Sequence, residues 1–394
     1  MLLNLSACVI IYIDLIMEEK FYYLDSAATT RMFDETRAYA ESFLCEEFYN
    51  PSAVYFPSVG VKRKITEARR FILNALGADS GNLYFTGSAT EANNMVIFSQ
   101  RLQTSKRFLF GAGEHPSVLE CAKELERRGY KVEYIPLDKT GKVDIEKYQA
   151  MLGSDVAFVS VQHVSNETGA INPIKELVRL AKKVNSEILF HSDGVQAFLK
   201  LPYSVLDLGV DYYTISAHKI YGPKGIGGLF VKKGVKIKPL IFGGGQEEGV
   251  RSGTENVFNI MAFYSSAKKM LGDREKNFET VQKHKSELLA EFDKLNIKYK
   301  IHGNQENPYI MNICLSDKVR GETLLHALEA RNVFVSTGSA CSASKHYNAT
   351  LEAMGIDKDE ILKSIRISIS PYLDFDAKII ARIIKEELNK FGEK

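Results

Sequence analysis

The sequence predicts an α/β fold in which helices flank a mostly parallel β-sheet, followed by a smaller α+β domain. From about residue 60 to residue 216, short apolar runs typical of buried strands alternate with helical patterns. Such alternation produces right-handed βαβ units around a parallel sheet. After about residue 270 the pattern changes to long helices separated by short strands. A chain of 394 residues has room for two or three domains at roughly 100–200 residues each.

The elements of the large domain follow in chain order. The strand patterns are rich in Val, Ile, Phe and Tyr, and helical patterns separate several of them. We expect strands at residues 82–85, 107–111, 131–135, 155–162, 187–192 and 212–216. We expect helices at residues 61–76, 89–103, 117–128 and 174–183. Parallel strands need such crossover connections, so this order supports the predicted sheet.

The second part of the chain is expected to form an α+β domain. Its predicted helices are residues 275–294, 321–331 and 376–392, and its predicted strands lie near 297–302, 308–316 and 364–370. We therefore expect a large domain at residues 30–272 and a small domain made of residues 17–29 and 273–394.

The first sixteen residues are apolar and contain neither Lys nor Arg. A secretory signal begins with positive charge, and a membrane span needs about 20 apolar residues, so neither is indicated. Met17 opens a stretch that resembles a natural start. We expect residues 1–16 to be a non-native or disordered extension, and a mature chain that begins before Met17 on N-terminal sequencing would contradict this.

Composition narrows the class of protein. The net charge is only +2, and 45% of the residues are hydrophobic, which is typical of a globular protein without a general nucleic-acid or membrane surface. The cysteines Cys8, Cys45, Cys121, Cys314 and Cys341 include no Cys-x-x-Cys pair. We therefore expect no structural metal site, no disulfide framework and a reducing, cytoplasmic location.

Ligands of an open α/β sheet bind beyond the carboxyl ends of its strands, and four polar segments follow predicted strands. Residues 86–91, TGSATE, open a helix, where backbone N–H groups favour a phosphate. The same pattern is also an ordinary capping box. His115 follows the next strand and could stack on a flat ring or move protons, although a hydrogen-bonded loop histidine is more common.

The other two segments carry opposite charges. Asp193 could keep a pyridinium nitrogen protonated, which makes a ring an electron sink, or it could simply cap a helix. Gln196, three residues on, could reach the phenolic oxygen of such a ring. A lysine at the end of a strand, such as Lys219, usually extends to solvent, but a desolvated lysine forms imines readily. Ser216 and His218 could contact a phosphate beside it.

Together these segments supply a phosphate loop, a ring-stacking histidine, a pyridinium partner and an imine-forming lysine. With them the chain resembles the class V, fold type I family of pyridoxal 5′-phosphate (PLP) enzymes, most closely its NifS/IscS-like cysteine desulfurases. The resemblance extends from about Tyr23 to the C-terminus. It rests on the segments LDSAATT, NPSAVY, TGSATEANN, HVSNETG, HSDGVQA, SAHKIYGPKGIG, GGGQEEGVRSGTEN, STGSACSAS and SIRISIS.

The resemblance implies the PLP-dependent transferase fold of type I and a role for each matching residue. Lys219 matches the Schiff-base lysine, and His115 matches the ring-stacking acid–base. The residues that match the cofactor contacts are Ala89, Thr90, His115, Asn166, Asp193, Gln196, Ser216, His218, Lys219 and Thr254. Asn166 and Arg366 match the residues that hold the carboxylate side of the substrate. Family members donate the Thr254 contact from the neighbouring subunit, which implies a homodimer.

Cys341 lies in the segment STGSACSAS. A run of small residues packs poorly, and a cysteine in such a loop often has no role. The match to the catalytic-cysteine loop of the family favours a nucleophile that takes sulfur from L-cysteine, leaving L-alanine and a Cys341 persulfide. The resemblance implies transfer of this sulfur to an acceptor protein for iron–sulfur cluster assembly or tRNA thiolation. Cys341 could also be a transient iron–sulfur ligand, and no direct contact with nucleic acid or membrane is expected.

Two other functions stay open from the sequence. One is a selenocysteine lyase or another class V enzyme, such as an aminotransferase or a kynureninase-like enzyme. An aminotransferase needs no reactive thiol, so Cys341 speaks against it. The other is a PLP-binding scaffold without turnover, which would have no need of Asp193, His115 and Lys219 together.

Overall fold

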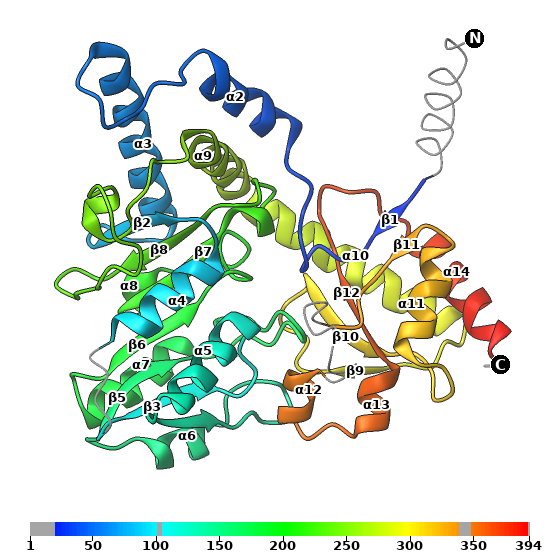
Figure 1. The fold of residues 1–394 in the computed structure, drawn as a ribbon. Coiled ribbons are helices and arrows are strands. Elements are labelled where there is room, and N and C mark those ends of the chain that lie inside the picture. Colours follow the sequence, from blue (N-terminus) through cyan, green and yellow to red (C-terminus); the bar gives the residue numbers. More distant parts are fainter. Residues whose placement is uncertain (1–19, 101–104, 339–347, 393–394) are drawn as a thin grey trace, which may run out of the picture.

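The structure, a computed structural model, describes residues 20–100, 105–338 and 348–392 (Figure 1). Its centre is a seven-stranded sheet in the order β2-β8-β7-β6-β5-β3-β4. The strands are β2 (Asn82–Thr86), β3 (Arg107–Gly111), β4 (Lys131–Ile135), β5 (Val156–Ser160), β6 (Leu189–Asp193), β7 (Tyr212–Ser216) and β8 (Gly227–Val231). The five neighbouring strands β7, β6, β5, β3 and β4 are parallel to one another, whereas β8 is antiparallel to both of its neighbours, β2 and β7. The predicted mostly parallel sheet is confirmed.

Helices cover both faces of this sheet, because successive side chains of a strand point to opposite sides. Phe108 and Phe110 of β3 pack in one apolar cluster with α4 and α5, whereas Leu109 between them packs in another with α3, α7 and α9. The flanking helices are α2 (Asp34–Cys45), α3 (Phe56–Ala75), α4 (Ala89–Ser99), α5 (Pro116–Arg127), α6 (Ile145–Met151), α7 (Ile174–Val184), α8 (Val205–Leu208) and α9 (Val257–Gly272).

The C-terminal part builds a second, smaller sheet. Strands β9 (Lys300–His302), β10 (Ile310–Cys314) and β12 (Ser364–Ser368) are antiparallel in the order β12-β10-β9. The helices of this part are α10 (Arg274–Lys294), α11 (Gly321–Glu329), α12 (Ala349–Ala353), α13 (Lys358–Lys363) and α14 (Ala377–Lys390). Near the N-terminus, β1 (Tyr22–Tyr23) pairs with β11 (Val333–Phe334), as Figure 1 shows. The predicted α+β character is confirmed.

The boundaries differ from the expected ones in a few places. Helix α4 ends at Ser99 rather than at residue 103, and residues 101–104 lie outside the described part of the chain. Helix α3 begins at Phe56, five residues before its expected start, with a proline in its first turn. The expected extension at residues 1–16 also lies outside the described residues.

A short N-terminal segment joins the two parts of the molecule. Ala27 donates its backbone N–H to Ser368 Oγ of the small sheet at 2.9 Å, and three residues later Thr30 donates to the His218 carbonyl at 3.0 Å. The segment therefore crosses the carboxyl edge of the large sheet. Among the described residues, no helix is both long enough and apolar enough to cross a membrane.

Candidate active site

The polar segments singled out in the sequence gather at one edge of the large sheet. Thr86 and Ser216, which end β2 and β7, both lie opposite Gly227 at the start of β8. Asp193 ends the neighbouring strand β6 and lies opposite Thr214. Because these strands point the same way, their carboxyl ends meet at this edge, where ligands of α/β sheets bind.

Gly227 brings the expected phosphate loop close to this edge. A Cβ atom at Gly227 would lie 2.7 Å from the Ser88 carbonyl carbon and 2.8 Å from the Ala89 nitrogen. Ser88 caps α4 by accepting a hydrogen bond from the Glu91 N–H at 3.1 Å. Ala89 and Thr90 form the first turn of α4, where backbone N–H groups have no acceptor within the helix. The loop thus keeps both the capping role and the N–H groups that an anion needs.

Asp193 and His115 belong to one hydrogen-bonded chain. Asn93 Nδ2 donates to Asp193 Oδ2 at 2.8 Å and to Ser117 Oγ at 2.9 Å, and Ser117 Oγ lies 2.8 Å from His115 Nδ1. The Val195 N–H donates to the second Asp193 oxygen at 3.0 Å. Burial lowers the pKa of His115, and nearby Lys219 lowers it further, although Asp193 opposes the shift. The sequence analysis missed Asn93, whose segment TGSATEANN was the available signal.

Glu114 is a buried carboxyl group that the sequence analysis did not assign. It accepts a hydrogen bond from the Gln162 N–H. Burial, together with the charge of Asp193, raises its pKa well above the usual range. Glu114 therefore binds a proton more readily than an exposed glutamate does, and Asp193 is the carboxyl group of this pair that Asn93 and the Val195 N–H orient.

Lys219 is held by the crossing N-terminal segment. Its Nζ donates to the carbonyl oxygens of Ala27 and Ala28, each at 2.6 Å. Gln196 Nε2 donates to the same Ala27 oxygen at 2.9 Å, which places the side chains of Gln196 and Lys219 next to each other. Lys200 Nζ donates to Gln196 Oε1 at 3.0 Å. Burial and the nearby Lys219 lower the pKa of Lys200 to about 7, and no pattern in the sequence had indicated this second lysine.

The remaining phosphate candidates lie around the same edge. Ser216 is buried, and His218 Nδ1 lies 3.2 Å from Thr29 Oγ1. Burial, with a contribution from Lys219, lowers the pKa of His218 to about 3, so the imidazole is neutral near pH 7. Thr254 is exposed to solvent, and it lines an open cavity of about 210 Å³ together with Thr86 and Gly87.

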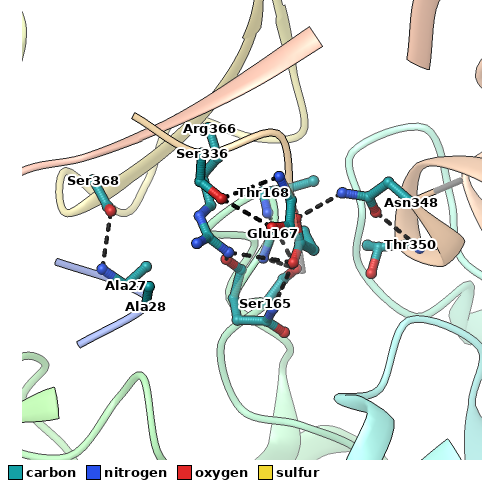
Figure 2. Close-up of polar contacts among 12 residues, drawn as sticks. Ala27, Ala28, Ser165, Glu167, Thr168, Ser336, Asn348, Thr350, Arg366 and Ser368 are labelled. Atoms are coloured by element: carbon teal, nitrogen blue, oxygen red, sulfur yellow. Dashed lines mark hydrogen bonds and ion pairs between the residues drawn. The ribbon is translucent and has the colours of Figure 1, made fainter. Parts of the chain in front are cut away.

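Arg366 belongs to strand β12 of the small sheet, and Figure 2 shows its guanidinium beside Glu167. Its Nη1 donates to the Asn166 carbonyl at 3.0 Å and to Glu167 Oε1 at 3.3 Å, and its Nη2 donates to Asp25 Oδ1 at 2.9 Å. Its buried Nε has no hydrogen-bond partner among the described residues. The structure thus brings Asn166 and Arg366 together and adds Asp25 and Glu167, which were not singled out from the sequence.

Cys341 lies outside the described residues. The nearest described residues in the chain are Gly338 and Asn348. Both lie beside Glu167, since a Cβ atom at Gly338 would be 3.1 Å from Glu167 Oε2 and Asn348 Nδ2 donates to the same oxygen at 2.6 Å.

The groups at this edge fit PLP in their chemistry. A lysine amine can form an imine with the aldehyde of PLP, and a buried carboxylate can pair with its pyridinium nitrogen. A neutral histidine can stack on the ring, and a helix N-terminus can bind the phosphate. Asp193 remains accessible to only 7%, so its charge acts in a poorly screened environment. This arrangement on an α/β sheet defines the class of PLP-dependent transferases of fold type I.

Comparison with known proteins identifies the family. The model of the family described as aminotransferase class-V matches residues 22–377, so the chain belongs to that family. It is 37% identical over 374 residues to the cysteine desulfurase IscS of Dictyoglomus turgidum, covering 92% of this chain and 94% of the relative. It is 35% identical over 358 residues to the cysteine desulfurase IscS of Methanosarcina thermophila, covering 89% and 88%.

Solved structures agree with this assignment. A structure described as a NifS-like protein superposes with a TM-score of 0.87 at 31% identity and covers 94% of this chain and 100% of the other. A structure described as SspA in complex with cysteine superposes with a TM-score of 0.78 at 28% identity, covering 90% of this chain and 100% of the other.

Proposed function

We propose that this protein is a cysteine desulfurase that converts L-cysteine to L-alanine and carries the sulfur as a persulfide on Cys341. The observation that carries the proposal is the meeting of Lys219 and Asp193 at the edge of the large sheet with Arg366 from the small sheet. The names of the relatives and the cysteine complex of SspA support the choice of substrate.

Lys219, Asp193 and His115 would hold the PLP cofactor, which supplies an electron sink for the charge left when the substrate Cα loses its proton. Asp193 would keep the ring nitrogen of the cofactor protonated, and Asn93 Nδ2 orients this carboxylate. Lys219 Nζ is the base that takes the Cα proton, with His115 assisting. Asp193 is buried, and Lys219 and His115 are half-buried, so water screens their charges less than it would at the surface.

Arg366 and Asn166 orient the substrate through its carboxylate. A guanidinium is always charged and can bind a carboxylate with two N–H groups. The Cys341 thiolate then attacks the sulfur of the substrate. A sulfur–sulfur bond forms and the Cβ–sulfur bond breaks. The Cβ receives a proton and Lys219 returns a proton to Cα, so that L-alanine leaves and the persulfide stays on Cys341.

The test incubates the purified protein with L-cysteine and measures sulfide, L-alanine and cofactor absorbance. Wild type is expected to be yellow and active. Cys341→Ala is expected to keep the colour and lose sulfide release, whereas Lys219→Ala is expected to lose the imine band. Normal turnover of L-cysteine by Cys341→Ala would contradict the mechanism. Turnover of L-selenocysteine alone would favour the selenocysteine lyase instead.

The finer assignments are also proposals. The persulfide passes to an acceptor protein of iron–sulfur cluster assembly or tRNA thiolation in the cytoplasm.

We propose that the protein has two domains, a large one at residues 30–272 and a small one made of residues 17–29 and 273–394. The apolar core of the small sheet supports this division, because it combines Tyr22 and Leu24 with residues from Val281 onward.

We propose further that the protein is a homodimer. Val54 is 94% exposed, Phe56 is 90% exposed and Phe242 is 82% exposed. Contact with a second copy would remove these large apolar side chains from water, which supports the proposal. Thr254 is exposed as well, which suits a residue that contacts the phosphate site of a second copy.

A further inference from the structure

Glu167 is a buried carboxylate on which three parts of the chain converge, as Figure 2 shows. Its Oε1 accepts hydrogen bonds from Asn166 Nδ2 at 2.7 Å and from Arg366 Nη1 at 3.3 Å. Its Oε2 accepts one from Asn348 Nδ2 at 2.6 Å. Hydrogen bonds to a charged acceptor are about twice as strong as neutral ones, and here they are shielded from water.

The chain just before the Cys341 segment is fixed to the same place. Ser336 and Arg366 exchange backbone hydrogen bonds at 2.6 and 3.1 Å. Ser336 Oγ also donates to the Gly338 carbonyl at 2.9 Å. Gly338 has a φ of 109°, which favours glycine, and a Cβ atom there would lie 2.7 Å from Asn348 Nδ2. The backbone at Gly338, the last described residue before residues 339–347, therefore lies directly beside Glu167 and Asn348.

The chain just after the segment is fixed by Asn348. Its Oδ1 accepts hydrogen bonds from the Thr350 and Leu351 N–H groups at 3.1 and 3.2 Å and so caps helix α12. Its Nδ2 is the group that donates to Glu167. One side chain therefore orients the start of the helix and connects it to the carboxylate.

We infer that Glu167 is a positioning residue that fixes the described chain on either side of residues 339–347, at Gly338 and Asn348, beside Arg366. It acts through Asn348 and Arg366 and takes no part in bond making. The inference rests on the proposed function, because Arg366 is there the residue that binds the substrate carboxylate. Cys341 lies between these two fixed points in the sequence, so a change at either point is expected to change the rate at which its thiol reacts with the substrate.

Asp25 provides a matched control for the charge of Glu167. Both carboxylates pair with Arg366, at 2.9 Å for Asp25 and 3.3 Å for Glu167, but Asn348 contacts Glu167. If Glu167 only neutralised Arg366, then Asp25→Asn and Glu167→Gln would have the same effect. If Glu167 anchors the segment, the two variants differ.

Asn348→Asp tests the hydrogen bond between residue 348 and Glu167 without removing the cap of helix α12, because aspartate caps helices as well as asparagine does. It places a carboxylate against Glu167 and breaks the hydrogen bond. The double variant Glu167→Gln/Asn348→Asp exchanges the two groups and restores an amide–carboxylate bond. If Glu167 only filled space, the double variant would not restore the property that each single variant loses.

The first measurement uses apo protein, so it does not depend on turnover. A spin label is attached to Cys341 after Cys8→Ser and Cys45→Ser substitutions. We expect a larger fast-motion fraction in the spectra of Glu167→Gln and Asn348→Asp, and spectra like those of the parent for Asp25→Asn and for the double variant. Identical spectra for the parent and Glu167→Gln, or equal changes in Glu167→Gln and Asp25→Asn, would overturn the inference.

The second measurement is the kinetics with L-cysteine. Misplacing a nucleophile by about 1 Å can cost roughly 100-fold in rate, so we expect Glu167→Gln to lower kcat about 10- to 100-fold. KM should change much less, because Arg366 keeps Asp25 and stays in place. A larger effect on KM than on kcat would overturn the inference. If wild type itself releases no sulfide, the proposed function fails while the spin-label result still decides the anchor.

Discussion

Lys200 illustrates at the residue scale how burial next to a second amine changes a lysine. Burial and Lys219 lower its pKa from 10.5 to about 7. In the unfolded chain the amine keeps its ordinary pKa, so protonation favours the unfolded state. The penalty on the native state is complete below about pH 7 and disappears as the pH rises toward about 10. Lys200 therefore reduces stability most under acidic and neutral conditions.

We predict that Lys200→Met makes the stability of the apo protein less dependent on pH. In wild type the free energy of unfolding should rise by up to about 4 kcal/mol from this residue between pH 7 and pH 10. The rise should be smaller in the variant, since methionine does not titrate. Urea unfolding at several pH values measures the free energy of unfolding of both proteins. If this free energy changed with pH equally in wild type and Lys200→Met, the lowered pKa of Lys200 would be contradicted.

The sequence predicted those site residues that directly follow strands. Asp193, Gln196 and Lys219 follow β6 and β7, and the strand order alone brings them to one edge. The partners that orient them could not be predicted in the same way. Glu167 and Arg366 are 199 positions apart, and a hydrogen bond over that separation depends on how two sheets pack rather than on any local pattern.

At the element scale, the close approach of α4 to β8 depends on one glycine. A Cβ atom at Gly227 would meet backbone atoms of Ser88, Ala89 and Ile215 at 2.7 to 2.9 Å. Backbone atoms cannot move aside as a side chain can, so the helix N-terminus would shift. The phosphate-binding N–H groups would shift with it.

We predict that Gly227→Ala weakens PLP binding about 10-fold or more, since a shift of the helix start misplaces several N–H donors together. Gly272→Ala is the control, because its added methyl group would meet no atom within 4 Å outside its chain neighbours and the backbone of its own helix. The measurement is the dissociation constant of PLP from absorbance titration of the apo protein. Equal PLP affinity in both variants would show that the loop tolerates the shift.

Helix prediction failed where helices lack a clear apolar stripe. Helix α9 buries Ile260, Met261, Ala262 and Phe263 in succession, because it packs against both α2 and α3. Burial on several sides removes the 3.6-residue period on which the prediction relies. Strands β3, β4 and β7 were predicted with their observed bounds, since their apolar runs are bounded by polar or turn residues.

His191 joins three neighbouring strands through its ring. It lies 2.9 Å from Ser160 Oγ of β5 and 3.1 Å from Thr214 Oγ1 of β7. Burial lowers its pKa to about 4, despite the opposing effect of Asp193. An unfolded histidine with a pKa near 6.5 takes up a proton first as the pH falls, so the native state loses stability from about pH 6.5 down to about pH 4.

We predict that this histidine alone costs the native state about 2 kcal/mol when the pH falls from 7 to 5. In His191→Gln the decrease should be smaller, because glutamine does not titrate. His326 is exposed on the surface, so His326→Gln should keep the full decrease. Urea unfolding at the two pH values measures it, and an unchanged pH dependence in His191→Gln would contradict the prediction.

At the scale of the whole molecule, the site needs residues from distant parts of the chain. The N-terminal segment around Ala27 holds Lys219, and the small sheet supplies Arg366. From the sequence, residues 17–29 were only expected to accompany the C-terminal part. The sequence could not show that this segment supplies the carbonyl oxygens to which Lys219 donates, since backbone contacts leave no trace in residue type.

The proposed dimer leads to a prediction that connects assembly with cofactor binding. Phe56 begins helix α3 and is 90% exposed, so Phe56→Asp should replace an apolar contact with a buried charge in a dimer and shift the protein to monomer. Val184→Asp, at the exposed end of α7, is the control. Light scattering after size exclusion should show a dimer for wild type and Val184→Asp.

If Thr254 of each copy completes the phosphate site of the other, monomeric Phe56→Asp should also bind PLP more weakly than wild type. Thr254→Ala should weaken PLP binding while the protein stays dimeric, because the hydroxyl is lost but the apolar contact remains. Absorbance titration of apo protein measures both affinities. A monomeric Phe56→Asp with the PLP affinity of wild type would separate assembly from cofactor binding and place Thr254 in the site of its own chain.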